Sequence, residues 1–301
     1  MKTKRVKPEY IEFTTKDGLC LPGLLYEKEK NTAVAIYLHG NGSSSVFYDE
    51  SNKLPLVQEL QKKHISVLYF NNRGAHMIKR LTLSKKGKSE RKNFGMVHEK
   101  IKECIQDIDG AIAFLKKKGY KTFYLIGAST GANKICVYNY YKPKNNIAKY
   151  ILLYGGDDTG IYYQALGKKK FWKILKESKK KIREKKGDII IKELLPDALF
   201  SYAGFWDIAN PDGDYNIFPF YEGFKKEKLS KKKLFRHFSS LLKPTFVVYG
   251  SEDEYTSGNV YDAVALLRVQ RPDLTYKIVK GADHGFNGKK RRLAKLIADW
   301  I

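Results

Sequence analysis

The segment from Tyr124 to Lys134 most constrains how this chain folds. An apolar run with strand character ends in Gly127-Ala128-Ser129-Thr130-Gly131, and a helix-like pattern begins directly after it. A serine on such a sharp strand-to-helix turn needs strained backbone angles, and small residues two positions away keep side chains out of the turn. Because glycine is common, this pattern arises by chance in roughly one chain in ten of this length, so the rest of the sequence decides its meaning.

The rest of the sequence alternates between apolar runs and helical patterns. Asp17-Gly18 separates the first two runs and predicts a β-hairpin. The later runs are mostly apolar and predict further strands, at residues 33–38, 65–70, 122–126, 149–154, 244–250 and 274–279. The run 33–38 is continuous and apolar, as is typical of a central strand covered on both faces. Between residues 99 and 118 apolar side chains recur with helical spacing. This order predicts an α/β fold with a mainly parallel central sheet, right-handed crossovers and helices on both faces.

Two segments interrupt the alternation. Residues 75–94 are strongly basic, and we expect a surface loop there. Residues 157–241 are too long for one crossover and predict a helical lid insertion, which leaves residues 1–156 and 242–301 as the core. The basic run 168–186 places apolar side chains on one helical face: Phe171, Ile174, Leu175 and Ile182. The aromatic second half either forms the core of a small helical subdomain or lines an acyl or aryl pocket under a lid.

Candidate catalytic side chains follow three of the predicted strands. Ser129 follows the run 122–126, Asp253 follows 244–250, and His284 follows 274–279. The carboxyl ends of parallel strands meet at one edge of a sheet, so these side chains can lie together. A nucleophile, a base and a carboxylate that orients the base are what acyl transfer requires. Other acids in similar places stay open as alternatives: Glu252, Glu254 and Asp157.

These motifs resemble the α/β-hydrolase superfamily from about residue 10 to the end, excluding the insertion. They are the elbow around Ser129, His39-Gly40-Asn41-Gly42, Gly250-x-x-Asp253 and Asp283-His284-Gly285-Phe286, in the superfamily's order. The resemblance implies Ser129 as nucleophile, His284 as general base and then acid, and Asp253 as the orienting carboxylate. It also implies an oxyanion hole formed by the backbone amides of Asn41 and Thr130.

Two short motifs qualify this resemblance. Asn71-Asn72-Arg73-Gly74 stands where Asp-x-Arg-Gly is more usual, so we expect a loop contact near the site to differ. Asn133-Lys134, after the elbow, is similar to a poorly characterised branch of esterase-like hydrolases. That branch does not define a substrate.

The function predicted from these residues is a serine hydrolase that cleaves a carboxylic ester, or a thioester, of a small molecule through an acyl-enzyme. The resemblance implies no cofactor and no metal, and an amidase or an acyltransferase would use the same residues. The alternative is a non-catalytic or acyl-transferring protein that binds an anionic or membrane partner through its basic insertion. The formal net charge is +25, but most of the excess is lysine spread along the chain, which favours a solvated surface. We find no nucleic-acid-binding motif and expect no nucleic-acid partner.

Features that bear on compartment are few. The basic stretch Met1–Pro8 is not followed by an apolar segment of signal-peptide length. No apolar run approaches the roughly 20 residues that span a bilayer. The three cysteines, Cys20, Cys104 and Cys136, have no metal-ligand spacing and predict reduced thiols. We therefore expect a cytoplasmic protein, and the sequence indicates no oligomeric state.

Overall fold

The structure is a computed structural model that describes residues 7–28, 32–42, 44–48, 50–195 and 198–301. Two parts of the segments discussed above lie outside the described residues. They are residues 1–6 of the basic N-terminal stretch and residues 196–197 of the predicted insertion.

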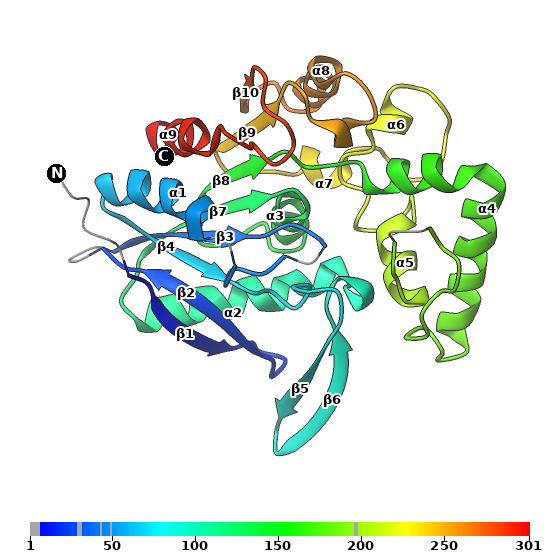
Figure 1. Cartoon of the computed structure of the whole chain (residues 1–301), viewed down its shortest axis with the longest axis horizontal. Coiled ribbons are helices and arrows are strands. Elements are labelled where there is room, and N and C mark those ends of the chain that lie inside the picture. The colour runs from blue at the N-terminus through cyan, green and yellow to red at the C-terminus, as the bar shows by residue number, and fades with distance from the viewer. Residues whose placement is uncertain (1–6, 29–31, 43, 49, 196–197) are drawn as a thin grey trace.

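An eight-stranded sheet forms the centre of the molecule (Figure 1). Its strands are β1 (Glu9–Thr14), β2 (Cys20–Tyr26), β3 (Ala33–Leu38), β4 (Ile65–Phe70), β7 (Thr122–Ala128), β8 (Ile147–Leu153), β9 (Thr245–Gly250) and β10 (Thr275–Val279). They lie in the order β1-β2-β4-β3-β7-β8-β9-β10. β1 and β2 pair as the predicted hairpin, β2 joins β4 antiparallel, and the remaining neighbours are parallel. The predicted mainly parallel sheet is confirmed.

Helices cover both faces of this sheet. They are α1 (Glu50–Lys62), α2 (Cys104–Lys117), α3 (Thr130–Tyr141), α8 (Val260–Gln270) and α9 (Lys290–Trp300). From β3 to β4 the chain crosses through α1 toward one edge, and from β7 to β8 it crosses through α3 toward the other edge. Because such crossovers are right-handed, α1 and α3 lie on opposite faces. α9 packs beside α1, and α2 beside α3.

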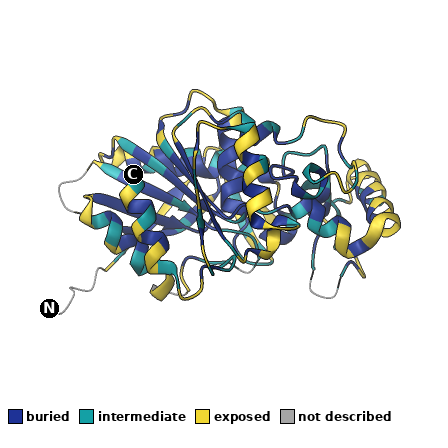
Figure 2. Cartoon of the chain, turned by 90° about the horizontal axis from the view of Figure 1, so that it is seen from above, coloured by how far each residue is buried: buried dark blue, intermediate teal, exposed yellow. Residues whose placement is uncertain are grey.

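The central strands are the most deeply buried part of the fold. β4 and β9 are buried along their whole length, as expected of strands with a helical layer on each side. Figure 2 shows these buried strands between helices whose exposed residues face outward. Among the described residues, every helix is too short or too polar to cross a membrane.

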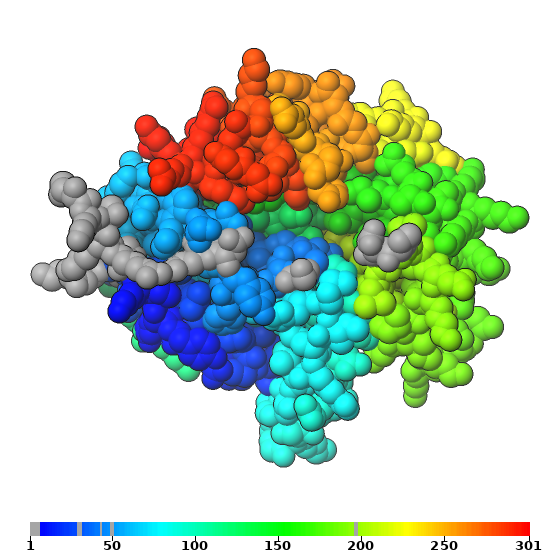
Figure 3. Space-filling model, viewed as in Figure 1, coloured from blue at the N-terminus to red at the C-terminus, as the bar shows by residue number. Residues whose placement is uncertain are grey.

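The basic segment 75–94 forms a β-hairpin and not the surface loop that we expected. It contains β5 (Lys79–Lys85) and β6 (Lys88–Phe94), which form a separate antiparallel hairpin. Lys86 and Gly87 at its tip both have positive φ, of 51° and 76°, which suits a two-residue turn between twisted strands. The hairpin projects from the body (Figure 3), so its residues are mostly exposed as predicted.

The insertion adds no described strand to the central sheet. It contains α4 (Asp158–Arg183), α5 (Tyr202–Ala209), α6 (Phe220–Gly223) and α7 (Arg236–Ser239), and α4 packs along α5 (Figure 1). Aromatic rings pack against one another within it: the centroids of Tyr163 and Phe171 are 5.2 Å apart, and Phe200 lies 6.3 Å from Phe205. Of the predicted apolar face of α4, Ile182 is exposed. These contacts favour the prediction of an internal aromatic core.

Candidate active site

Ser129 occupies the turn between β7 and α3. Its φ is 54° and its ψ is −124°, a combination that side-chain-bearing residues rarely adopt. A Cβ at Gly127 would lie 2.2 Å from the carbonyl oxygen of Gly131, and a Cβ at Gly131 would lie 2.1 Å from that of Leu38. Neither position has room for a side chain. Both glycines are therefore needed to bring the strand, the turn and the end of β3 together.

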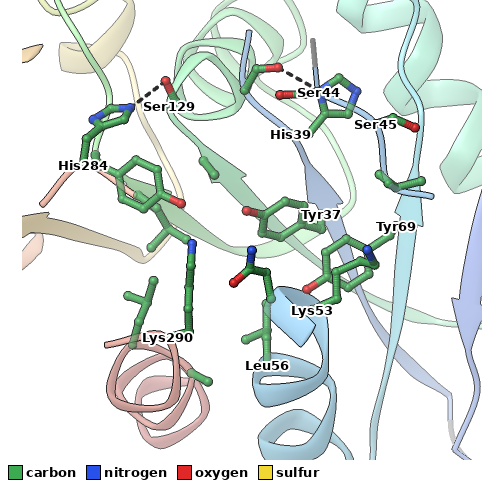
Figure 4. A pocket seen from close by; sticks show the side chains of 18 of the residues that line it. Tyr37, His39, Ser44, Ser45, Lys53, Leu56, Tyr69, Ser129, His284 and Lys290 are labelled. Carbon is green, nitrogen blue, oxygen red and sulfur yellow. Dashed lines mark hydrogen bonds between the residues drawn. The ribbon is translucent and has the colours of Figure 1, made fainter. Parts of the chain in front are cut away.

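His284 links Ser129 to Asp253. Its Nε2 lies 3.0 Å from Ser129 Oγ, and its Nδ1 lies 2.9 Å from Asp253 Oδ1 (Figure 4 shows the first contact). A carboxylate can only accept, so Nδ1 donates to Asp253 and Nε2 is left to accept the Ser129 proton. The rings of Tyr154 and Tyr255 lie 4.9 and 4.4 Å from the imidazole, centroid to centroid. These contacts hold the imidazole between the serine and the carboxylate.

Among the described residues, the alternative acids make no hydrogen bond to His284. Glu252 and Glu254 are exposed. Asp157 caps the start of α4, and its carboxylate accepts hydrogen bonds from the amides of Gly160 and Tyr221 at 2.8 and 2.6 Å. Burial raises the pKa of Asp157 to about 6. Among the described residues, Asp253 is the acid that hydrogen bonds to His284.

The loop after β3 passes directly beside Ser129. A Cβ at Gly40 would lie 3.0 Å from Ser129 Cβ. Thr130 is the first residue of α3, where an amide has no acceptor within the helix. Within the described ranges, the N–H groups of Asn41 and Thr130 donate no hydrogen bond to the protein. Two amides beside the nucleophile, both without a protein acceptor, are what an oxyanion hole requires.

His39 fixes the shape of this loop. Its Nε2 accepts from the amide of Asn72 at 3.2 Å, so Nδ1 carries the hydrogen and donates to the Gly40 carbonyl at 2.8 Å. Burial, with a smaller contribution from the Lys134 charge, lowers the pKa of His39 to about 3. The ring is therefore neutral at physiological pH, and it holds the loop rather than acting as the base.

A cavity of about 550 Å³ opens beside Ser129 (Figure 4). Three tyrosines from the sheet line it: Tyr37, Tyr69 and Tyr154. Apolar side chains of α1 and α9 form another wall, and two lysines of these helices also line it: Leu56, Leu293, Ile297, Lys53 and Lys290. None of the described lining residues belongs to the insertion. Of the two alternatives for the aromatic half of the insertion, the structure favours an internal core over a wall of this pocket, because those rings pack against one another.

Comparison with known proteins places the chain in a family. The model of a protein family of unknown function, DUF1749, matches residues 92–300, a segment that contains Ser129, Asp253 and His284. The chain belongs to the DUF1749 family. No curated protein sequence matches it.

Solved esterases share the fold of this DUF1749 protein. Est1E from Butyrivibrio proteoclasticus superposes with a TM-score of 0.60 and 13% identity, over 97% of this chain and 96% of that one. Carboxylesterase CesB from Bacillus subtilis superposes with a TM-score of 0.55 and 13% identity, over 98% of this chain and 92% of that one. The esterase Pf2001 from Pyrococcus furiosus superposes with a TM-score of 0.55 and 19% identity, over 98% of this chain and 93% of that one. The DUF1749 protein therefore has the α/β-hydrolase fold that its motifs predicted.

A buried ion pair beneath the elbow was not predicted. Lys134, on α3, is 1% exposed, and its ammonium lies 2.5 Å from Glu99 Oε1. The ammonium also donates to Asn72 Oδ1 at 3.3 Å, and the same oxygen accepts from the amide of Gly74 at 3.0 Å. Asn72 belongs to the unusual Asn71-Asn72-Arg73-Gly74 motif. In this DUF1749 protein the neutral amide of Asn72 accepts a hydrogen bond from Lys134, and Glu99 balances the charge of that lysine.

Replacing Glu99 with glutamine should destabilise the protein strongly. The substitution leaves the Lys134 charge buried without its counter-charge, and breaking such a pair costs about 3–5 kcal/mol of unfolding free energy. For a chain of this size, we expect a fall of roughly 10 °C in the thermal unfolding midpoint, measured by circular dichroism. Adding Lys134→Met to Glu99→Gln should recover most of the loss. A Glu99→Gln midpoint equal to that of the parent would show that the pair is not the source of stability.

Proposed function

We propose that this protein is a serine hydrolase that cleaves carboxylic esters through an acyl-enzyme on Ser129. The observation that carries the proposal is the continuous hydrogen-bonded line from Asp253 through His284 to the hydroxyl of Ser129. Each group in this line has the partner that its chemical role requires. The strained turn holds Ser129 in the wall of a cavity that an ester can enter.

The first half of the reaction forms the acyl-enzyme. Ser129 Oγ attacks the ester carbonyl carbon while His284 Nε2 takes its proton. The carbonyl oxygen gains negative charge and accepts hydrogen bonds from the amides of Asn41 and Thr130. The imidazolium, stabilised by Asp253, then gives the proton to the leaving alkoxide oxygen as the carbon–oxygen bond breaks.

The second half returns the enzyme to its starting state. His284 takes a proton from water, whose oxygen attacks the acyl carbon. The bond from that carbon to Ser129 Oγ breaks, Oγ regains a proton from His284, and a carboxylic acid leaves. A thioester would react through the same steps with a thiol as the leaving group. An alcohol in place of water would make the reaction an acyl transfer.

The cavity indicates an aryl or medium-sized acyl group as the preferred substrate part. Its volume of about 550 Å³ suits a small ligand, and its tyrosine rings and aliphatic side chains favour apolar or aromatic groups. One solved structure of Est1E holds ferulic acid, an aromatic acid. We therefore propose aryl and medium-chain acyl esters as the first substrates to examine.

A fluorophosphonate probe tests this function, because it reacts with serines activated by a base and an oxyanion hole. We expect the intact mass of the parent protein to rise by one adduct, located on the peptide that contains Ser129, and no adduct on Ser129→Ala. p-Nitrophenyl esters of increasing chain length would then define the acyl preference. Absence of labelling in a folded parent protein would reject the proposed function.

A further inference from the structure

One tyrosine of the insertion contacts both residues of the proposed oxyanion hole. Tyr215 lies between α5 and α6 and is 2% exposed. Asn41 Nδ2 donates to the Tyr215 hydroxyl at 3.1 Å, and that hydroxyl donates to Thr130 Oγ1 at 3.3 Å. Tyr215 is not among the residues that line the cavity.

We propose that Tyr215 is a positioning residue that holds the two oxyanion-hole amides in place and thereby couples the insertion to catalysis. This inference rests on the proposed function. Tyr215 would touch neither the substrate nor the reacting atoms. Its effect would pass through the side chains of Asn41 and Thr130 to their backbone amides.

The loop that carries Asn41 needs such a contact. Asn41 stands between Gly40 and Gly42, and Gly42 has a φ of 84° with open space where a side chain would be. Glycines on both sides give the backbone little restraint of its own, so hydrogen bonds must set the direction of the Asn41 amide. His39 Nδ1 holds the Gly40 carbonyl, which belongs to the same peptide unit, at 2.8 Å, and Tyr215 holds the Asn41 side chain. Among the described residues, Asn41 Oδ1 has no hydrogen-bond partner, and the bond to Tyr215 is the one that restrains this side chain.

Tyr215 is itself held firmly by the residues on either side of it. Asp214 accepts from the Tyr141 hydroxyl of α3 at 2.8 Å and lies 3.1 Å from Nε2 of His237 in α7. The ring of Phe218 fills the space beside Gly155, where a Cβ would lie 2.2 Å from Phe218 Cε2. These contacts join the segment around Tyr215 to the core of the fold. A shift of this segment would move the hydroxyl away from both of its partners.

Tyr215→Phe tests the proposal, because it removes the hydroxyl and keeps the ring. We expect kcat for a p-nitrophenyl ester to fall about tenfold, less than the roughly 100- to 1000-fold lost when an oxyanion donor is deleted. KM should stay within about twofold, since the cavity is unchanged. A trifluoromethyl ketone, which forms a tetrahedral oxyanion on the serine, should bind weaker by the same factor as kcat falls. Tyr202→Phe is the matched control, because its hydroxyl donates to Glu177 within the insertion, and it should behave like the parent.

A second substitution keeps the test decisive. Thr130→Val removes the acceptor of the Tyr215 hydroxyl and retains the backbone amide, so it should lower kcat at constant KM. It should add no further loss to Tyr215→Phe, because the two changes break one shared contact. Asn41→Ala removes the other partner of the Tyr215 hydroxyl and likewise retains the backbone amide. If Tyr215→Phe does not fold, an unchanged kcat in both Thr130→Val and Asn41→Ala would overturn the proposal.

The outcomes separate this inference from the function on which it rests. A parent protein that is labelled at Ser129, with Tyr215→Phe matching it in kcat and inhibitor affinity, overturns only the positioning role. A lower unfolding midpoint with unchanged kcat has the same meaning, since it shows a purely structural tyrosine. A folded parent that is not labelled at Ser129 rejects the hydrolase function and this inference together.

Discussion

Replacing His284 with alanine should lower kcat for ester hydrolysis by about 10⁶, as much as Ser129→Ala. The reason is geometric, since His284 Nε2 is 3.0 Å from Ser129 Oγ and among the described residues it is the group positioned to take the proton. Serine and base act as one unit, so the Ser129→Ala/His284→Ala double variant should be no slower than either single variant. Initial rates with p-nitrophenyl butyrate, measured at high enzyme concentration, would quantify the residual activity.

A second histidine provides the control for this experiment. His64 is exposed at the end of α1 with a φ of 57°, and asparagine tolerates that backbone conformation. His64→Asn should keep the rate of the parent protein. If His284→Ala retained more than about one hundredth of the parent kcat, a different base would have to be sought.

The parts of the fold predicted correctly are those set by local pattern. β4 and β9 consist mainly of apolar residues, so their burial on both faces follows from their composition. The turn at Ser129 is indicated by glycines at positions where the structure has no space for a Cβ. Because parallel strands end at one edge, the order of the strands was enough to place Ser129, Asp253 and His284 near one another.

The features that the sequence did not predict are those set by contacts between residues far apart in the chain. In β5, Leu81 and Leu83 alternate with exposed residues and pack against the hydrophobic core. The many basic residues of β5 and β6 make this alternation of apolar and polar residues hard to recognise in the sequence. Lys134 of α3 forms an ion pair with Glu99, and the spacing of these two residues in the sequence does not predict this contact. The cavity is walled by α1 and by α9 at the far end of the sequence, because these helices meet on one face of the sheet. Tyr215 is one of many aromatic residues in the second half of the insertion, and nothing in the local sequence distinguishes it.

Asp253→Asn should lower kcat by about 10⁴, whereas Asp157→Asn should leave it close to that of the parent. Asparagine keeps the size of the Asp253 side chain but removes the negative charge that stabilises the imidazolium and fixes the His284 tautomer. Asp157 has its carboxylate engaged by the start of α4 and by the amide of Tyr221.

The two variants must be compared in both rate and stability. Asp157→Asn should change the unfolding midpoint more than kcat, because Asp157 caps a helix and contacts the insertion, whereas Asp253→Asn should change kcat far more than the midpoint. The expected contrast follows from how each carboxylate is used. Asp157 accepts with both oxygens, and asparagine has only one acceptor oxygen. Asp253 Oδ1 alone accepts from His284 Nδ1 at 2.9 Å and from the amide of Tyr255 at 3.0 Å, so asparagine can keep the second bond. A large loss of kcat in Asp157→Asn with full activity in Asp253→Asn would assign the orienting carboxylate to Asp157 and show that the site rearranges before it reacts.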